Sequence, residues 1–261
     1  MDIILIQIYI FAFGMAIGSF LNVLLYRMPR HLGFSIGRSF CPKCKTQIKF
    51  YDNIPLISYL ILGGKCRACK AKISIRYPLV ELLNALIYLF LFYTYSLSGN
   101  FFVYAFISSM LIVIFFIDLE FQIIPDLITL PGMVIGLAVS FLPDGIGIVS
   151  SSVGLLIGGG VLYLIAIFGD LIFKKESMGG GDIKMAAMLG AFLGWQKVVL
   201  IFFGGAAIGL IVSIIAMIVS SKIRSTRVIP FGPFLAVAAF LSMIYGEKII
   251  SFYINNFLLN S

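Results

Sequence analysis

The chain has 261 residues, of which 61% are apolar and 11% charged, and its formal net charge is +8. A soluble domain carries about a quarter charged residues, so the composition excludes an ordinary soluble globule and indicates that lipid surrounds most of the chain. The basic excess could suggest nucleic acid, but these residues lie in loops between apolar runs, where they act first as an orientation signal. We expect a lipid bilayer and no nucleic-acid partner.

Eight apolar runs divide the chain. They lie near residues 3–25, 79–97, 101–117, 127–142, 146–168, 183–195, 198–219 and 231–246. No basic residue precedes the first run and no small-residue cleavage site follows it, so we expect a retained anchor rather than a secretory signal. The sixth run is the doubtful one, because it is clearly shorter than the 20 or so residues that a crossing needs. The sequence predicts an all-α polytopic membrane protein with about eight transmembrane helices.

Charge indicates the orientation of these helices. If all eight runs cross and the N-terminus faces outward, every basic residue except Lys197 and Lys248 lies on the inner side. If the sixth run re-entered instead, the cluster Lys222–Arg227 would lie outside, against the positive-inside bias. We therefore expect eight crossings in a cytoplasmic (inner) membrane. The expected division is a first transmembrane helix at 1–27, a cytoplasmic loop domain at 28–77 and a transmembrane domain at 78–261.

All four cysteines lie in the 28–77 loop. They form two CxxC pairs, Cys41 with Cys44 and Cys66 with Cys69. Two such turns can place four thiolates around one ion, and the spacing is close to that of structural zinc sites. Disulfides or free thiols are the alternative, although a cytoplasmic loop is kept reduced. We expect a structural Zn²⁺ that holds the fold of a segment too small for a core of its own.

Acidic residues gather at the ends of apolar runs. Asp118 directly follows one run, Asp126 precedes the next within Ile-Pro-Asp, and Asp182 follows the glycines Gly179–Gly181 at the start of the sixth run. With the orientation above, all three lie at the inner face. Carboxyl groups at membrane depth are costly and point to function, although Asp126 after a proline is typical of the first turn of a helix.

Asp118 and Asp182 are suited to aspartic peptidase chemistry if folding brings them together. Two carboxyl groups a few ångströms apart share one proton, so that the ionised group activates water and the protonated group polarises the scissile carbonyl. Successive glycines lack Cβ atoms, so Gly179, Gly180 and Gly181 allow an extended substrate to approach the backbone closely.

A set of short motifs follows in order along most of the chain. The motifs are Gly18-Ser19-Phe20-Leu21-Asn22-Val23, Cys41-Pro42-x-Cys44, Asp52-Asn53-Ile54-Pro55, Gly64-Lys65-Cys66-Arg67-x-Cys69, Arg76-Tyr77-Pro78-x-Val80-Glu81, Asp118 with Ile124-Pro125-Asp126, Gly179–Lys184, and Pro230-Phe231-Gly232-Pro233-Phe234. In this order the chain resembles the bacterial type IV prepilin peptidases, which are bifunctional leader peptidases and N-methyltransferases of the GxGD aspartic class (family A24).

The resemblance implies that Asp118 and Asp182 are the catalytic pair. It implies prepilins or pilin-like proteins as substrates, cut on the cytoplasmic side after a basic leader and then methylated at the new N-terminus with S-adenosylmethionine. Candidates for contacts with the methyl donor are Asp52, Asn53, Gly64, Lys65 and Glu81.

Other functions remain open on sequence alone. A peptidase without methyltransferase activity is one, although such relatives typically lack the cysteine loop. A transporter with the two aspartates as an ion site is another, but transporters tend to bind at the bilayer midplane between repeated halves. A non-catalytic zinc scaffold is the third. Only the peptidase hypotheses predict leader removal.

Overall fold

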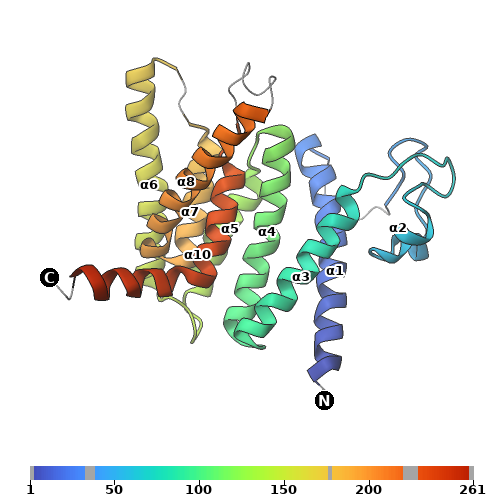
Figure 1. The fold of residues 1–261 in the computed structure, drawn as a ribbon, viewed down its shortest axis with the longest axis horizontal. Coiled ribbons are helices and arrows are strands. Elements are labelled where there is room, and N and C mark those ends of the chain that lie inside the picture. The colour runs from blue at the N-terminus through green and yellow to red at the C-terminus, as the bar shows by residue number, and fades with distance from the viewer. Residues whose placement is uncertain (1–2, 33–38, 176–177, 220–228, 259–261) are drawn as a thin grey trace. The chain divides into compact units, whose positions relative to one another are not determined.

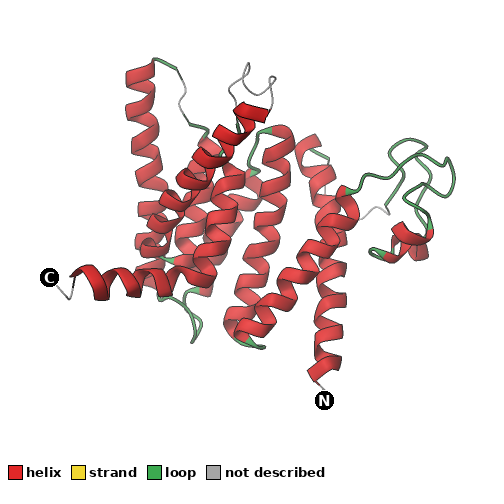
Figure 2. Ribbon diagram, viewed as in Figure 1, coloured by secondary structure: helices red, strands yellow, loops and turns green. Residues whose placement is uncertain are grey.

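The computed structural model describes residues 3–32, 39–175, 178–219 and 229–258, and this part of the chain is helical with connecting loops (Figures 1 and 2). The main helices are α1 (Ile3–Arg27), α3 (Arg76–Tyr95), α4 (Gly99–Phe121), α5 (Asp126–Val139), α6 (Ile148–Phe173), α7 (Gly180–Leu193), α8 (Trp195–Val219) and α10 (Gly232–Tyr253). The basic cluster Lys222–Arg227 lies outside the described residues.

The predicted all-α membrane fold is confirmed, and its helices differ clearly in length. Among the described residues, six helices are long and apolar enough to cross a membrane: α1, α3, α4, α6, α8 and α10. The helices α5 and α7 have 14 residues each, which corresponds to about 21 Å against a hydrocarbon core of about 30 Å.

Contacts divide the chain into two compact units, Met1–Val113 and Ile114–Ser261. In the first unit α1 packs against α3 through two glycines. A Cβ on Gly14 would lie 2.7 Å from the Cα of Ala85, and a Cβ on Gly18 would lie 2.7 Å from the Cα of Glu81. The two backbones therefore approach more closely than side chains would permit, a packing mode typical of membrane helices.

A buried polar group joins three helices of the first unit. Asn84 on α3 donates a hydrogen bond to the carbonyl oxygen of Gly14 on α1 at 2.7 Å. Its amide oxygen accepts one from the hydroxyl of Ser109 on α4 at 2.9 Å. Because hydrocarbon offers no partner for such groups, these hydrogen bonds fix the register of the helices.

The second unit is built around α7. All residues of this helix from Met185 to Leu193 are buried, and it packs against α6 at Gly154 and Gly190, where a Cβ on either glycine would overlap the backbone of the other helix. In Figure 1, α6 ends and α7 begins at the upper end of the unit, and α7 leads down to the start of α8. The sixth apolar run thus forms the central, buried helix of this bundle.

The cysteine loop lies between α1 and α3. Its described part contains two isolated β-bridges, Phe40 with Gln47 and Lys65 with Lys72, each closing a hairpin around one CxxC pair. Between the hairpins lie the short helices η2 (Phe50–Asn53) and α2 (Ile57–Ile61). The cysteine loop thus has turns and bridges in place of a core of packed elements.

Candidate active site and metal site

The structure brings the two predicted catalytic aspartates to one end of the second unit. Asp118 is in the last turn of α4, and Asp182 is in the first turn of α7. In Figure 1 the end of α4 and the starts of α5, α7 and α10 lie at the same, upper end of this unit. Both aspartates lie near the same residue, Ile124, because Gly181 beside Asp182 packs on its side chain and so does Gly232, which contacts Asp118. The chain segment between them, from α5 to α6, runs down the bundle and returns.

The start of α10 is the third wall of this site. A Cβ on Gly232 would lie 2.6 Å from Oδ2 of Asp118 and 3.1 Å from Cδ1 of Ile124. The backbone N–H of Gly232 donates a hydrogen bond to the Asp118 carboxyl group. Because only a glycine lets the backbone approach this closely, the carboxyl group of Asp118 is held by main chain at the N-terminus of a helix.

The carboxyl group of Asp182 differs from that of Asp118 in its hydrogen bonding. One of its carboxyl oxygens, Oδ1, is buried and has no hydrogen-bond partner among the described residues. Behind it, Gly181 packs on Ile124, where a Cβ would come within 2.9 Å of the isoleucine Cβ. Gly179 and Gly180 are exposed. A buried, unpartnered carboxyl oxygen beside an open glycine backbone suits a group that acts on a bound molecule.

The four cysteines form a single cluster within the cysteine loop. Their sulfur atoms all lie within 4.8 Å of one another, and the sulfurs of Cys41 and Cys69 are 3.9 Å apart. Four sulfurs at about 2.3 Å from a tetrahedral Zn²⁺ would be separated by about 3.8 Å. The cluster therefore has the donor atoms and the size for a closed tetrahedral metal site.

The backbone of the two turns favours thiolates. Hydrogen bonds from Thr46 lower the pKa of Cys44 to about 6. Backbone hydrogen bonds from Cys69 and Ala68 also lower the pKa of Cys66. The pKa of Cys69 is instead raised to about 11, despite a backbone hydrogen bond from Ala71, because the neighbouring thiols oppose its ionisation. Thiolates are the metal-binding form of cysteine, so the donor chemistry also fits zinc.

The five candidates for methyl-donor contacts do not form one cluster. Asp52 forms a bidentate ion pair with Arg67, with distances of 2.8 Å from Nε to Oδ2 and 2.6 Å from Nη2 to Oδ1, and this contact lowers the pKa of the aspartate. Glu81 is buried on α3 and accepts a hydrogen bond from the backbone N–H of Leu56. Asn53 and Lys65 are exposed, and Gly64 has a positive φ of 66°.

Two family models match the chain one after the other. Residues 12–95 match the bacterial peptidase A24 N-terminal domain, and residues 105–214 match the type IV leader peptidase family. The prepilin leader peptidase/N-methyltransferase of Aeromonas hydrophila is 34% identical over 273 residues, which covers 95% of this chain and 94% of the relative. The chain belongs to the type IV leader peptidase family.

Proteins of the same description in other bacteria are equally similar. That of Legionella pneumophila is 34% identical over 93% of this chain and 92% of its own length, and that of Neisseria gonorrhoeae is 34% identical over 90% and 89%. No solved structure matches the chain. The two leader peptidase matches together contain both aspartates and all four cysteines.

An ion pair beside the two aspartates was missed by the sequence reasoning. Asp126 lies in the first turn of α5, as expected, but both of its carboxyl oxygens also lie 2.8 Å from Nζ of Lys184 on α7. The pair joins the segment after Asp118 to the turn that carries Asp182. The sequence shows a lysine, Lys184, two residues after Asp182, but only the fold shows that its partner is Asp126.

We expect Asp126→Asn and Lys184→Gln to lower peptide cleavage only modestly. The side chains of Lys184 and Asp126 are 41% and 53% exposed, and an exposed ion pair contributes about 0.2–1 kcal/mol, which is at most about a fivefold effect on rate. The exchanged double variant Asp126→Lys with Lys184→Asp should recover part of the loss. Cleavage rates of the four proteins decide the matter, and a loss from Asp126→Asn as large as that from a catalytic aspartate would show that Asp126 acts in the chemistry itself.

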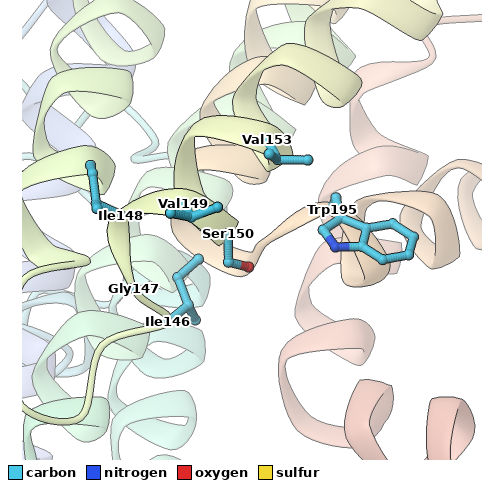
Figure 3. A pocket seen from close by; sticks show the side chains of 7 residues that line it. All are labelled: Ile146, Gly147, Ile148, Val149, Ser150, Val153 and Trp195. Carbon is cyan, nitrogen blue, oxygen red and sulfur yellow. The ribbon is translucent and has the colours of Figure 1, made fainter.

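A pocket of about 570 Å³ lies at the opposite end of the second unit (Figure 3). It is lined mainly by residues 146–150 at the start of α6, with Val153, and by Trp195 at the start of α8. None of the lining residues is an acid or a base, and α7 separates the pocket from Asp182 along its whole length. The pocket therefore has no part in the aspartate site.

Proposed function

We propose that the protein is a prepilin leader peptidase and N-methyltransferase in which Asp118 and Asp182 cut the peptide bond. The observation that supports the assignment of these residues is that two aspartates 64 positions apart in sequence come to the same end of the second unit, near the exposed backbone of Gly179 and Gly180. Acidic groups are placed together in this way at a cost that a purely structural role would not explain.

The reaction follows from a pair of carboxyl groups that share one proton. The ionised aspartate takes a proton from a water molecule while the water oxygen attacks the scissile carbonyl carbon. The protonated aspartate donates its proton to the carbonyl oxygen, which gives a gem-diol and exchanges the protonation states of the two aspartates. As the C–N bond breaks, the newly protonated aspartate donates its proton to the leaving nitrogen, and the other aspartate takes back a proton from one gem-diol hydroxyl, whose oxygen becomes the carbonyl oxygen of the new acid. Over one cycle each aspartate gains one proton and loses one, so the pair returns to its starting state.

The asymmetry of the site supports a division of roles between substrate contact and anchoring. Asp118 is fixed by the main chain at Gly232, whereas Asp182 has an oxygen free to bond a bound carbonyl group. The glycines before Asp182 leave room for the extended backbone of a leader junction. We propose the cytoplasmic face of the inner membrane as the location, because prepilins present the junction there next to a hydrophobic helix.

The cysteine cluster is proposed to hold one structural Zn²⁺. Cys41, Cys44, Cys66 and Cys69 would be its ligands, and the ion would supply the cross-link that the loop lacks as a core. With four protein ligands the ion has no open position, so it takes no part in cleavage. The methyl donor would be S-adenosylmethionine, and Asp52, Asn53, Gly64, Lys65 and Glu81 remain the candidates for contact with it.

Incubation of the purified protein in detergent with a prepilin tests the proposed function. We expect mass spectrometry to detect removal of the leader and, with S-adenosylmethionine present, addition of one methyl group to the new N-terminus. Cleavage without methylation would leave only the peptidase. A transporter or a scaffold would produce neither change.

A further inference from the structure

The short helix α2 in the cysteine loop exposes an apolar surface. Ile57 is 50% exposed, Leu60 is 70% exposed and Ile61 is 74% exposed, and Phe50 in the preceding η2 is 77% exposed. The four side chains come from two adjacent short elements of one loop. An exposed apolar patch of this kind, on a segment with few packed neighbours, indicates a surface that contacts another molecule or a membrane.

The position of α2 along the membrane helices is fixed by a hydrogen bond. The backbone N–H of Leu56, which precedes α2, donates to Oε2 of Glu81 at 2.8 Å, and Glu81 packs directly on Gly18 of α1. Glu81 lies five residues inside the start of α3 and Gly18 lies nine residues before the end of α1. At 1.5 Å per residue, α2 therefore begins about 8–14 Å from the ends of these helices.

If the basic ends of α1 and α3 lie among the headgroups, this depth corresponds to the boundary between headgroups and acyl chains. Helices that lie in a membrane surface bury their apolar face by about 5–10 Å. In Figure 1, α2 accordingly lies beside α1 and α3 rather than beyond their ends.

The backbone around α2 is suited to surroundings without water. The N–H groups of Leu56, Ile57, Ser58, Leu60, Leu62, Gly63 and Gly64 all donate hydrogen bonds within the protein. The hydroxyl of Ser58 also donates one, to the carbonyl oxygen of Tyr51 at 2.8 Å. Irregular backbone at membrane depth requires such internal partners, so the polar groups of this segment permit contact with lipid while its apolar side chains favour it.

Charge identifies the kind of surface. From residue 39 to residue 75 the loop has six lysines and one arginine, and its one acid, Asp52, is already paired with Arg67. Lys49 and Lys65 stand on either side of the apolar segment and are exposed. Juxtamembrane lysines are attracted to anionic phospholipid headgroups, whereas the basic leader of a prepilin would be repelled.

We propose that α2 is an interfacial helix that inserts into the phospholipid leaflet on the side of the cysteine loop. Ile57, Leu60 and Ile61 contact acyl chains, and the flanking lysines contact anionic headgroups. The cysteine loop is thereby held at the membrane surface by lipid as well as by its two covalent connections to α1 and α3.

Fluorescence quenching by brominated phospholipids tests this proposal on the full chain. Trp195 is the one tryptophan, so Leu60→Trp in a Trp195→Phe background reports on α2 alone. The matched control is Gln47→Trp, an exposed site in the same loop. Gln47 is bridged to Phe40, which contacts Tyr26 near the end of α1, about 12 Å further along that helix than Gly18.

In vesicles that contain phosphatidylglycerol, we expect bromines near the headgroup end of the acyl chains to quench the Leu60→Trp protein severalfold more strongly than the Gln47→Trp protein. The emission of the Leu60→Trp protein should also be shifted to shorter wavelength. Ile61→Trp gives an independent reporter if Leu60→Trp does not fold. Equal quenching at the α2 and control positions would overturn the proposal, and so would an α2 signal that responds only when a prepilin is added. Neither result depends on peptidase activity, so failure here is distinct from failure of the proposed function.

Discussion

Asp118→Asn and Asp182→Asn should each abolish measurable removal of a prepilin leader. Either change removes a carboxyl group from the pair, so that water activation and proton donation can no longer be divided between two groups. General acid–base catalysis contributes about 10²- to 10⁴-fold, so loss of either carboxyl group should take the rate of cleavage below detection. Initial rates of cleavage in detergent measure the effect.

Asp144→Asn is the matched control for the catalytic variants. Asp144 is exposed in the loop between α5 and α6, at the end of the unit opposite the aspartate pair. The same chemical change there should leave cleavage unchanged. All three variants should retain helical content and elute from a sizing column as the unmodified protein does. A folded Asp118→Asn or Asp182→Asn variant that still cleaves would refute the pair.

The parts of the fold that sequence predicted are those with a strong local signal. Apolar runs of about 20 residues are typical of membrane helices, so α1, α3, α4, α6 and α8 follow from hydropathy alone. Whether the sixth run is buried depends on the helices that pack around it. Gly154 and Gly190 let α6 and α7 pack backbone to backbone, and α7 is then shielded from lipid, a fact that no property of its own residues reveals.

The candidate site was predictable in its members but incompletely in its contacts. Asp118 and Asp182 stand out because carboxyl groups are rare at membrane depth. Lys184 looked like an ordinary inner-face lysine, and its pairing with Asp126 depends on how α5 meets α7. Gly232 was part of a matching motif, but its closeness to Asp118 results from the packing of α10 against a helix more than a hundred residues earlier. Long-range contacts of this kind have no counterpart in a local pattern.

In the cysteine loop, the contacts among the candidate residues were predictable, but the position of the loop was not. Two CxxC turns predict a cluster from spacing alone, and the four sulfurs do converge. The same spacing does not predict where the remainder of the loop lies. That position depends on Glu81 receiving the N–H of Leu56, a contact between a membrane helix and a loop that the sequence separates by 25 residues.

Cys66→Ser should unfold the cysteine loop and abolish methylation while leaving most of the intrinsic cleavage. Structural zinc contributes about 10–16 kcal/mol of apparent binding free energy in zinc-finger peptides, far more than a loop with turns and isolated bridges gains from its own contacts. Metal analysis should detect one zinc per unmodified chain and none in the variant. Trypsin should cut the variant at the exposed lysines of the loop, such as Lys43 and Lys70, much faster than the unmodified protein.

Ala68→Ser provides the control, because it adds a hydroxyl between Cys66 and Cys69 without removing a sulfur, and it should retain zinc, methylation and resistance to trypsin. Asp118 and Asp182 belong to the second compact unit and the cysteines to the first, so the two activities should separate when only the first unit is damaged. Equal loss of cleavage and methylation in a Cys66→Ser protein whose membrane helices remain folded would contradict this separation. It would show that the cysteine loop supports the aspartate pair directly. The two activities would then depend on one folded site rather than two.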